Sequence, residues 1–148
     1  MASWFIVCDN EAELKLVLEE KRVPFRTDAS NLAKSDRCVV YASKNAWGHP
    51  NKDEPQVIAI GKFLGAAEKT PVTLGEETIE ESAKVEITAV QPERLGMPLK
   101  PLVVDLWFVR KKATWWNYVR KPVISIPEQD FETIAIAFMS WTRSHPAP

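Results

Sequence analysis

Short apolar segments separated by turns constrain this chain most, because only two stretches carry the apolar spacing of an amphipathic helix. Strands are predicted for five segments: Ser3–Cys8, Arg37–Ser43, Gln56–Phe63, Lys84–Val90 and Val123–Ile126. Helices are predicted from Asn10 to about Lys21 and from Pro127 to about Trp141. The order of strand, helix, several strands and helix predicts an α+β fold, a small, curved, mixed β-barrel with peripheral helices.

Several residues carry local structural signals. Gly61, inside the third predicted strand, is expected to allow close approach of another backbone. Ser125 and Glu128 have the spacing of a capping box, with Pro127 in the first turn of the last helix. Residues 25–34 follow the first helix, are polar and irregular, and are expected to form a loop.

The composition is that of an ordinary globular domain. With 148 residues, of which 45% are hydrophobic, the chain is expected to form one domain over residues 1–143 and a frayed tail over residues 144–148. No apolar run approaches the roughly 20 residues that span a bilayer, so no membrane partner is expected. The N-terminal residues do not resemble a secretory signal, and Cys8 and Cys38 lie in apolar runs. These features predict a cytoplasmic protein with buried, reduced cysteines.

Residues 107–121 (WFVRKKATWWNYVRK) combine aromatic rings with positive charge, and no Asp or Glu occurs from Trp107 to Pro127. The whole chain has 19 basic and 20 acidic residues, so this charge is a local feature. Aromatic faces can stack on unpaired bases, and cations neutralise phosphates. The same pattern also occurs in a core strand with a solvated edge, so this segment alone leaves both interpretations open.

Two adjacent tryptophans in this segment are expected to have different surroundings. In an extended segment, Trp115 and Trp116 would point to opposite faces. We expect Trp115 to be the more structural of the two and Trp116 to lie near the surface or a pocket.

The sequence contains no familiar catalytic set. His49 and His145 have no Cys or second His at ligand spacing, so no metal site is predicted. Residues 61–65 (GKFLG) lack the ending and the following helix of a phosphate-binding loop, and no Gly-x-Ser-x-Gly occurs. The glutamates between Glu76 and Glu81 are expected to face solvent. We therefore predict a binding protein without a cofactor, and not an enzyme.

The C-terminal third carries motifs in a recognisable order. They are Pro101-Leu102, residues 106–111 (LWFVRK), Trp115 and residues 127–131 (PEQDF), and residues 4–6 (WFI) and 37–41 (RCVVY) also fit. With these motifs the chain resembles the EVE group of PUA-like domains over nearly its whole length, and more distantly the YTH domain. The resemblance implies a small β-barrel with peripheral helices. It also implies binding of RNA or DNA, with a modified cytosine or a methylated adenine flipped into an aromatic pocket.

One departure from the family pattern affects the pocket. Many relatives carry a Trp just after the first helix, where this chain has residues 23–28 (VPFRTD). Phe25 is expected to replace that ring, and Trp47 in the next loop is a second possibility. The predicted base pocket therefore comprises Phe25, Arg26, Thr27, Asp28, Trp47 and Trp116. The predicted contacts with the nucleic-acid backbone are Arg110, Lys111, Lys112, Arg120 and Lys121.

Two other functions stay open at this point. The first is a nucleotide-processing enzyme, which paired acids with raised pKa values in the same cleft would favour. The second is a module that binds a protein or a small molecule, in which the basic segment is only solvated surface. A concave aromatic pocket beside the basic segment would favour nucleic-acid binding.

Overall fold

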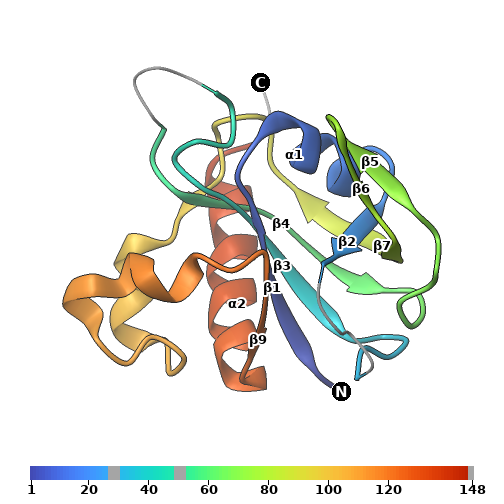
Figure 1. Cartoon of the computed structure of the whole chain (residues 1–148). Coiled ribbons are helices and arrows are strands. Elements are labelled where there is room, and N and C mark those ends of the chain that lie inside the picture. The colour runs from blue at the N-terminus through green and yellow to red at the C-terminus, as the bar shows by residue number, and fades with distance from the viewer. Residues whose placement is uncertain (27–30, 49–52, 147–148) are drawn as a thin grey trace.

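A strongly curled sheet with helices on both of its faces forms the body of the molecule (Figure 1). The computed structural model describes residues 1–26, 31–48 and 53–146. The strands are β1 (Ser3–Cys8), β2 (Arg22–Phe25), β3 (Arg37–Ala42), β4 (Gln56–Phe63), β5 (Val72–Leu74), β6 (Glu77–Ile79), β7 (Glu81–Val90), β8 (Met97–Pro98) and β9 (Val123–Ile126). The helices are α1 (Glu11–Leu18), the 3₁₀ segments η1 (Lys100–Asp105) and η2 (Lys112–Val119), and α2 (Glu128–Ser144).

The strand order is β2-β7-β4-β3-β1-β9, with β8 paired to one end of β4 and the β5–β6 hairpin forming a separate small sheet. Strands β1 and β3 are parallel, and the other neighbours in the main sheet are antiparallel. The sheet curls into a half-barrel (Figure 1). The predicted α+β fold with a small, curved, mixed barrel is therefore confirmed.

Strand β1 is buried along its whole length because both faces of the sheet are covered. Trp4 and Ile6 belong to the hydrophobic core that α1 closes. Phe5 and Val7 belong to the core that η1, η2 and α2 close on the opposite face. The alternation of side chains along a strand thus divides the interior into two apolar layers.

Both cysteines lie in the α1-side core as free, buried thiols, as predicted. Gly61 also behaves as predicted, because it lies where β4 and β7 shift register. A Cβ atom at this position would lie 2.3 Å from the carbonyl oxygen of Glu86. Only glycine allows this approach of the two backbones.

Four local predictions are wrong. Phe25 ends strand β2 and does not begin a loop; Pro24 is tolerated there because β2 is an edge strand. Helix α2 has Pro127 at its N-cap, and no side chain caps it, so Ser125 and Glu128 form no capping box. The segment around Trp115 is 3₁₀-helical and not extended. Helix α1 ends at Leu18, before the predicted limit.

Within the described ranges, no helix is both long and apolar enough to cross a bilayer.

Candidate nucleic-acid interface

The start of helix α2 holds the basic–aromatic segment in place. Asp130 is fully buried, and its two carboxylate oxygens accept hydrogen bonds from the backbone N–H groups of Trp107 and Phe108, both at 2.8 Å. These bonds anchor the connection between η1 and η2 to a rigid helix. Because charge-assisted hydrogen bonds are about twice as strong as neutral ones, Asp130 fixes where η2 begins its course over the surface.

The aromatic residues of this segment divide between core and surface. Phe108 packs on Phe5, with ring centroids 5.7 Å apart, and Trp115 packs against the α2-side core. Trp107 is 65% exposed and Trp116 is 50% exposed. In a 3₁₀ helix, adjacent residues point about 120° apart, which lets Trp115 turn inward while Trp116 faces solvent. The expected difference between the two tryptophans is present, although the backbone that produces it is helical.

A concave cleft of about 270 Å³ opens beside this segment, between η2 and the ends of β1 and β3. Its walls include Trp115, Trp116 and Tyr41, whose rings offer apolar surface. The rings of Trp115 and Trp116 meet edge-to-face, with centroids 6.5 Å apart and an interplanar angle of 77°. The Trp115–Trp116 cleft, as we call it, can therefore receive a flat aromatic group against a ring that is half exposed.

Polar groups in the Trp115–Trp116 cleft come from two loops. Ser43 and Asn45, which follow β3, supply a hydroxyl and an amide, and Asp9 supplies a carboxylate. Burial, with a smaller contribution from Asp9, raises the pKa of Tyr41, so this phenol keeps its proton over the physiological range. The cleft thus contains both donors and acceptors for the edge of a base.

The positive charges lie around the same cleft. Arg120 and Lys44 line it directly. The other predicted backbone contacts, Arg110, Lys111, Lys112 and Lys121, are exposed on or next to η2, as is Arg120. Among the described residues, no carboxylate forms an ion pair with any of the five predicted backbone contacts. The ammonium group of Lys112 donates a hydrogen bond to the backbone carbonyl of Leu106.

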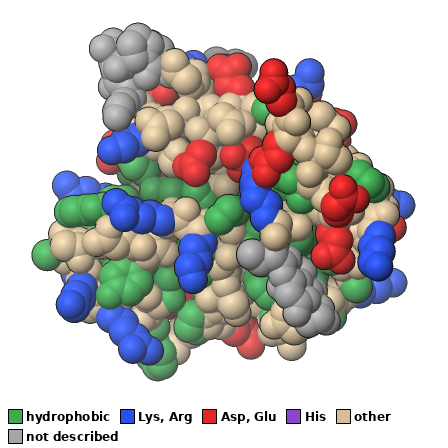
Figure 2. Space-filling model, in the orientation of Figure 1, with side chains coloured by type: hydrophobic (Ala, Val, Ile, Leu, Met, Phe, Trp, Pro, Cys, Tyr) green, Lys and Arg blue, Asp and Glu red, His purple; other side chains and the backbone are tan. Residues whose placement is uncertain are grey.

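The distribution of charge over the surface is strongly uneven. Figure 2 shows Lys and Arg side chains interleaved with hydrophobic ones on the side that carries η1 and η2. Most Asp and Glu side chains visible in that view gather over α1 and the β5–β6 hairpin. A net charge of −1 therefore conceals a separate basic and a separate acidic region.

The predicted pocket residues after α1 have different surroundings. Phe25 is only 5% exposed and packs on Phe63, with centroids 6.1 Å apart, so its ring is part of the core. Arg26 forms an ion pair with Glu77 at 3.0 Å. Thr27 and Asp28 lie outside the described residues. Phe25 also lines a hollow of about 290 Å³, whose other walls are Arg26 and residues 77–81. Because the ring is almost wholly buried in the core, it offers little surface for stacking there.

A small recess does lie next to these residues. It is bounded by β1, α1, Pro24 and Arg26, and its volume is about 10 Å³, too small for a base. Glu13 lines it; burial raises the pKa of this carboxyl, and the charge of Arg26 opposes the shift. Val7, which lines this recess, donates its backbone N–H to the carbonyl of Pro122, and no described residue lines both the recess and the Trp115–Trp116 cleft.

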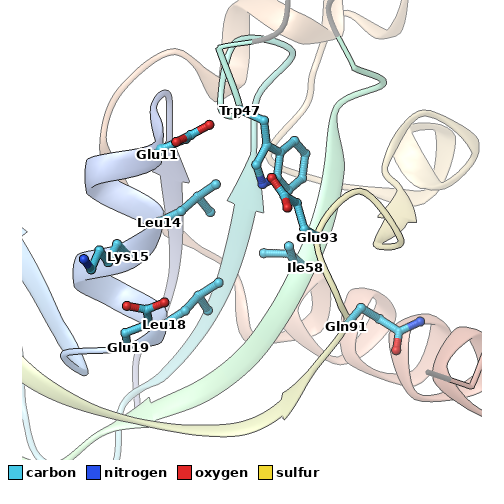
Figure 3. A pocket seen from close by; sticks show the side chains of 9 residues that line it. All are labelled: Glu11, Leu14, Lys15, Leu18, Glu19, Trp47, Ile58, Gln91 and Glu93. Carbon is cyan, nitrogen blue, oxygen red and sulfur yellow. The ribbon is translucent and has the colours of Figure 1, made fainter. Parts of the chain in front are cut away.

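Trp47 lies in a separate concavity, away from Trp116. This Trp47 groove has a volume of about 340 Å³ and lies between α1 and β4 (Figure 3). Trp47 itself is 7% exposed, and the rim carries Glu11, Glu19 and Glu93. The structure therefore does not bring Trp47 and Trp116 into one pocket.

Several cleft residues had no signal in the sequence. Tyr41 lies in an apolar strand pattern, and Ser43, Lys44 and Asn45 resemble ordinary turn residues. Only the parallel pairing of β1 and β3 places Asp9 beside them. Within residues 1–26, 31–48 and 53–146, no group of three or more His, Cys, Asp or Glu side chains could hold a metal ion.

No protein-family model and no curated protein matches the sequence. Among solved structures, the YTH domain-containing protein mmi1, in a complex with RNA, has a TM-score of 0.69 at 5% identity, over 97% of this chain and 84% of that one. The YTH domain of Zygosaccharomyces rouxii MRB1, in complex with N6-methyladenosine RNA, has a TM-score of 0.56 at 12% identity, over 93% and 86%. Human THYN1, in complex with DNA containing 5-methylcytosine, has a TM-score of 0.50 at 10% identity, over 100% of both chains.

This chain has a YTH-like fold. The similarity extends over nearly the whole molecule and confirms the fold implied by the resemblance to EVE and YTH domains. In this YTH-like domain, the basic–aromatic segment lies at the outer edge of the α2 face, beside the ends of β1 and β3.

Proposed function

We propose that this domain binds RNA or DNA and recognises a modified base, a methylated adenine or a modified cytosine, without catalysing a reaction. The observation that carries the proposal is the Trp115–Trp116 cleft, an aromatic concavity beside a basic segment free of described ion pairs. The solved structures with the same fold support it, because two of them hold methylated RNA or methylated DNA.

Electrostatics favours this cleft over the Trp47 groove and over the hollow beside Phe25 as the nucleic-acid site. The Trp47 groove carries three carboxylates, and the hollow beside Phe25 is lined by Glu77, Glu80 and Glu81. Phosphates would be repelled from both, whereas Arg120 and Lys44 would attract them to the Trp115–Trp116 cleft.

The proposed mode of binding combines stacking with charge neutralisation. An unpaired base stacks on the exposed face of Trp116, which contributes roughly 1–3 kcal/mol. Ser43 and Asn45 hydrogen-bond the edge of the base, and a methyl group gains apolar contact with the tryptophan rings. Arg110, Lys111, Lys112, Arg120 and Lys121 hold the phosphates. Among the described residues, Asp9 is the only carboxylate that lines this cleft, which favours a binding role over acid–base catalysis by a carboxylate pair.

Two further elements of the proposal concern the cell. We propose a cytoplasmic location, which the two buried, free cysteines support. A nucleic acid, and neither a metal nor a membrane, is the proposed partner.

The test compares two exposed tryptophans. Trp116→Ala should weaken binding to every probe by about 5- to 150-fold, the equivalent of one lost stacking contact, and should abolish any preference for a modified probe. Trp107→Ala, an equally conservative loss of an exposed ring outside the cleft, should keep the preference. Binding is measured by fluorescence anisotropy at one salt concentration, with matched oligonucleotides that carry adenine, N6-methyladenine, cytosine or 5-methylcytosine.

A preference that survives Trp116→Ala but disappears in Glu13→Gln or Arg26→Ala would contradict the proposed site, because it would assign recognition of the base to residues outside the Trp115–Trp116 cleft. Absence of binding by the parent protein to all probes would refute the proposed function.

A further inference from the structure

The Trp47 groove has an apolar floor and a negatively charged rim. Leu14 and Ile58 form part of the floor, and they are 5% and 2% exposed. Figure 3 shows Leu14 and Leu18 pointing from α1 toward Trp47 and Ile58 across the groove. The groove is therefore a cleft between a helix and a strand with an aromatic wall, and it takes no part in the proposed nucleic-acid site.

The charge of the rim selects the kind of ligand. Glu11, Glu19 and Glu93 line the groove, against one lysine, Lys15. In Figure 3, Lys15 points away from Trp47, to the other side of α1. The groove thus presents carboxylates around apolar surface, which attracts cations and repels nucleic acid.

The chain itself already places a guanidinium group next to this aromatic wall. The Cζ atom of Arg94 lies 5.5 Å from the ring centroid of Trp47, and its Nη1 lies 3.1 Å from Oε1 of Glu93. Its Nε also forms an ion pair with Oδ1 of Asp53, at 3.1 Å. Arg94 adopts a left-handed backbone conformation, with φ of +64°, which costs free energy for a residue other than glycine. The ring of Trp47 and the carboxylate of Glu93 therefore already contact one guanidinium group together.

The length of the rim indicates a chain segment and not a small ion. Glu11 begins α1 and Glu19 is its C-cap, so the two are eight residues apart, which corresponds to roughly 12 Å along a helix. An extended segment of about four residues has this length. We propose that the Trp47 groove docks a short segment of a partner protein in which arginine or lysine alternates with apolar residues. Its apolar side chains would cover Leu14, Leu18 and Ile58, and its cations would meet the rim.

The probe is an eight-residue peptide that alternates leucine and arginine, with binding followed by isothermal titration calorimetry and by NMR shifts of the Trp47 indole. The variant Glu11→Gln/Glu19→Gln/Glu93→Gln should weaken binding at least fivefold, since each rim pair contributes modestly. The control Glu68→Gln/Glu76→Gln/Glu80→Gln removes the same charge from exposed positions outside the groove and should change affinity less than twofold. All six glutamates are exposed, so both variants should keep the melting temperature of the parent.

A gain-of-affinity variant makes the test sharper. Arg94→Asn keeps a residue that tolerates the left-handed backbone but removes the competing guanidinium group, and it should tighten peptide binding by about two- to fivefold.

Three results would overturn the proposal. The parent protein could fail to bind the peptide, the two triple variants could lose affinity equally, or arginine amide alone could bind as tightly as the peptide. The last result would identify a site for small organic cations. None of these outcomes depends on the nucleic-acid assays, because no residue of the Trp115–Trp116 cleft is changed.

Discussion

At the scale of single residues, Asp36 shows how one buried carboxylate organises a corner of the fold. It is 2% exposed and accepts hydrogen bonds from the backbone N–H groups of Ala2 and Ala33 and from the indole of Trp4, at 3.0, 3.0 and 3.1 Å. Burial acts to raise the pKa of Asp36, but the three hydrogen bonds and the N-terminal charge outweigh it, so the pKa lies below its ordinary value. Asp36 therefore joins the N-terminus to the turn before β3.

The direction of this pKa shift predicts a pH dependence. A carboxyl whose pKa is lower in the folded state stabilises the fold above its unfolded pKa, and this contribution is lost as the pH falls. Asp36→Asn should lower the free energy of unfolding by roughly 1–3 kcal/mol at pH 7, because one side-chain oxygen becomes an NH₂ donor that faces N–H groups. The difference from the parent should shrink below about pH 4. Urea unfolding from pH 7 to pH 2.5 measures both quantities, and a difference independent of pH would contradict the prediction.

At the scale of elements, the junction between η1, η2 and α2 determines whether the Trp115–Trp116 cleft exists. Residues 107–121 carry the chemistry proposed for nucleic-acid binding, but η2 alone is too short to hold its own conformation. The buried carboxylate of Asp130 supplies the missing support from the first turn of α2. The motif PEQDF thus has a structural role, since its aspartate ties residues 107–121 to the core.

This support can be tested by one substitution. Asp130→Asn keeps the shape of the side chain but places an NH₂ donor against a backbone N–H donor. This should lower the free energy of unfolding by roughly 1–3 kcal/mol. It should also weaken nucleic-acid binding although Asp130 is fully buried, because the segment that carries Trp116 loses its anchor. Asp105→Asn is the control, since it removes the same charge from an exposed residue of η1. Chemical denaturation and anisotropy measure the two effects; unchanged binding by Asp130→Asn would show that η2 is held by its apolar contacts alone.

At the scale of the whole molecule, the separation of charge bears on which side could attract nucleic acid. The basic residues around η2 and the acidic residues around α1 lie on different parts of the surface (Figure 2). Such a distribution would attract a polyanion to the Trp115–Trp116 cleft, and the acidic region would repel the polyanion from the surface around α1. A chain with a net charge close to zero can therefore bind nucleic acid through one region.

This separation predicts the salt dependence of binding. Arg110→Ala and Arg120→Ala should each reduce the slope of log K against log salt concentration by about 0.7 for single-stranded probes, the equivalent of one phosphate contact. They should weaken binding with little regard to base sequence. Lys69→Ala removes an exposed cation far along the chain, near β5, and should leave the slope unchanged. Equal slopes for all three variants and the parent would exclude phosphate contacts at Arg110 and Arg120.

The sequence by itself was enough for the features that depend on local patterns. Period-two alternation and the 3.6-residue spacing in α1 and α2 depend on neighbouring residues, and both were predicted correctly. The close approach at Gly61 was also predicted correctly, although the carbonyl of Glu86 that it meets belongs to another strand. The basic–aromatic segment was also visible, because aromatic and cationic residues follow one another along the chain.

Only the tertiary structure decided which aromatic rings face solvent and which concavity has which charge. Phe25 and Trp47 look like loop aromatics in the sequence, but long-range packing buries both, and Trp47 lies beside the glutamates of α1. The pairing of β1 with β3 brings Asp9 and Asn45 to the cleft of Trp116, although more than 100 residues separate Asp9 from Trp116 in the sequence. Periodicity reports whether a side chain is turned inward or outward on its own element. Which other element covers that side chain depends on the closure of the whole sheet, and this information is absent from any short segment.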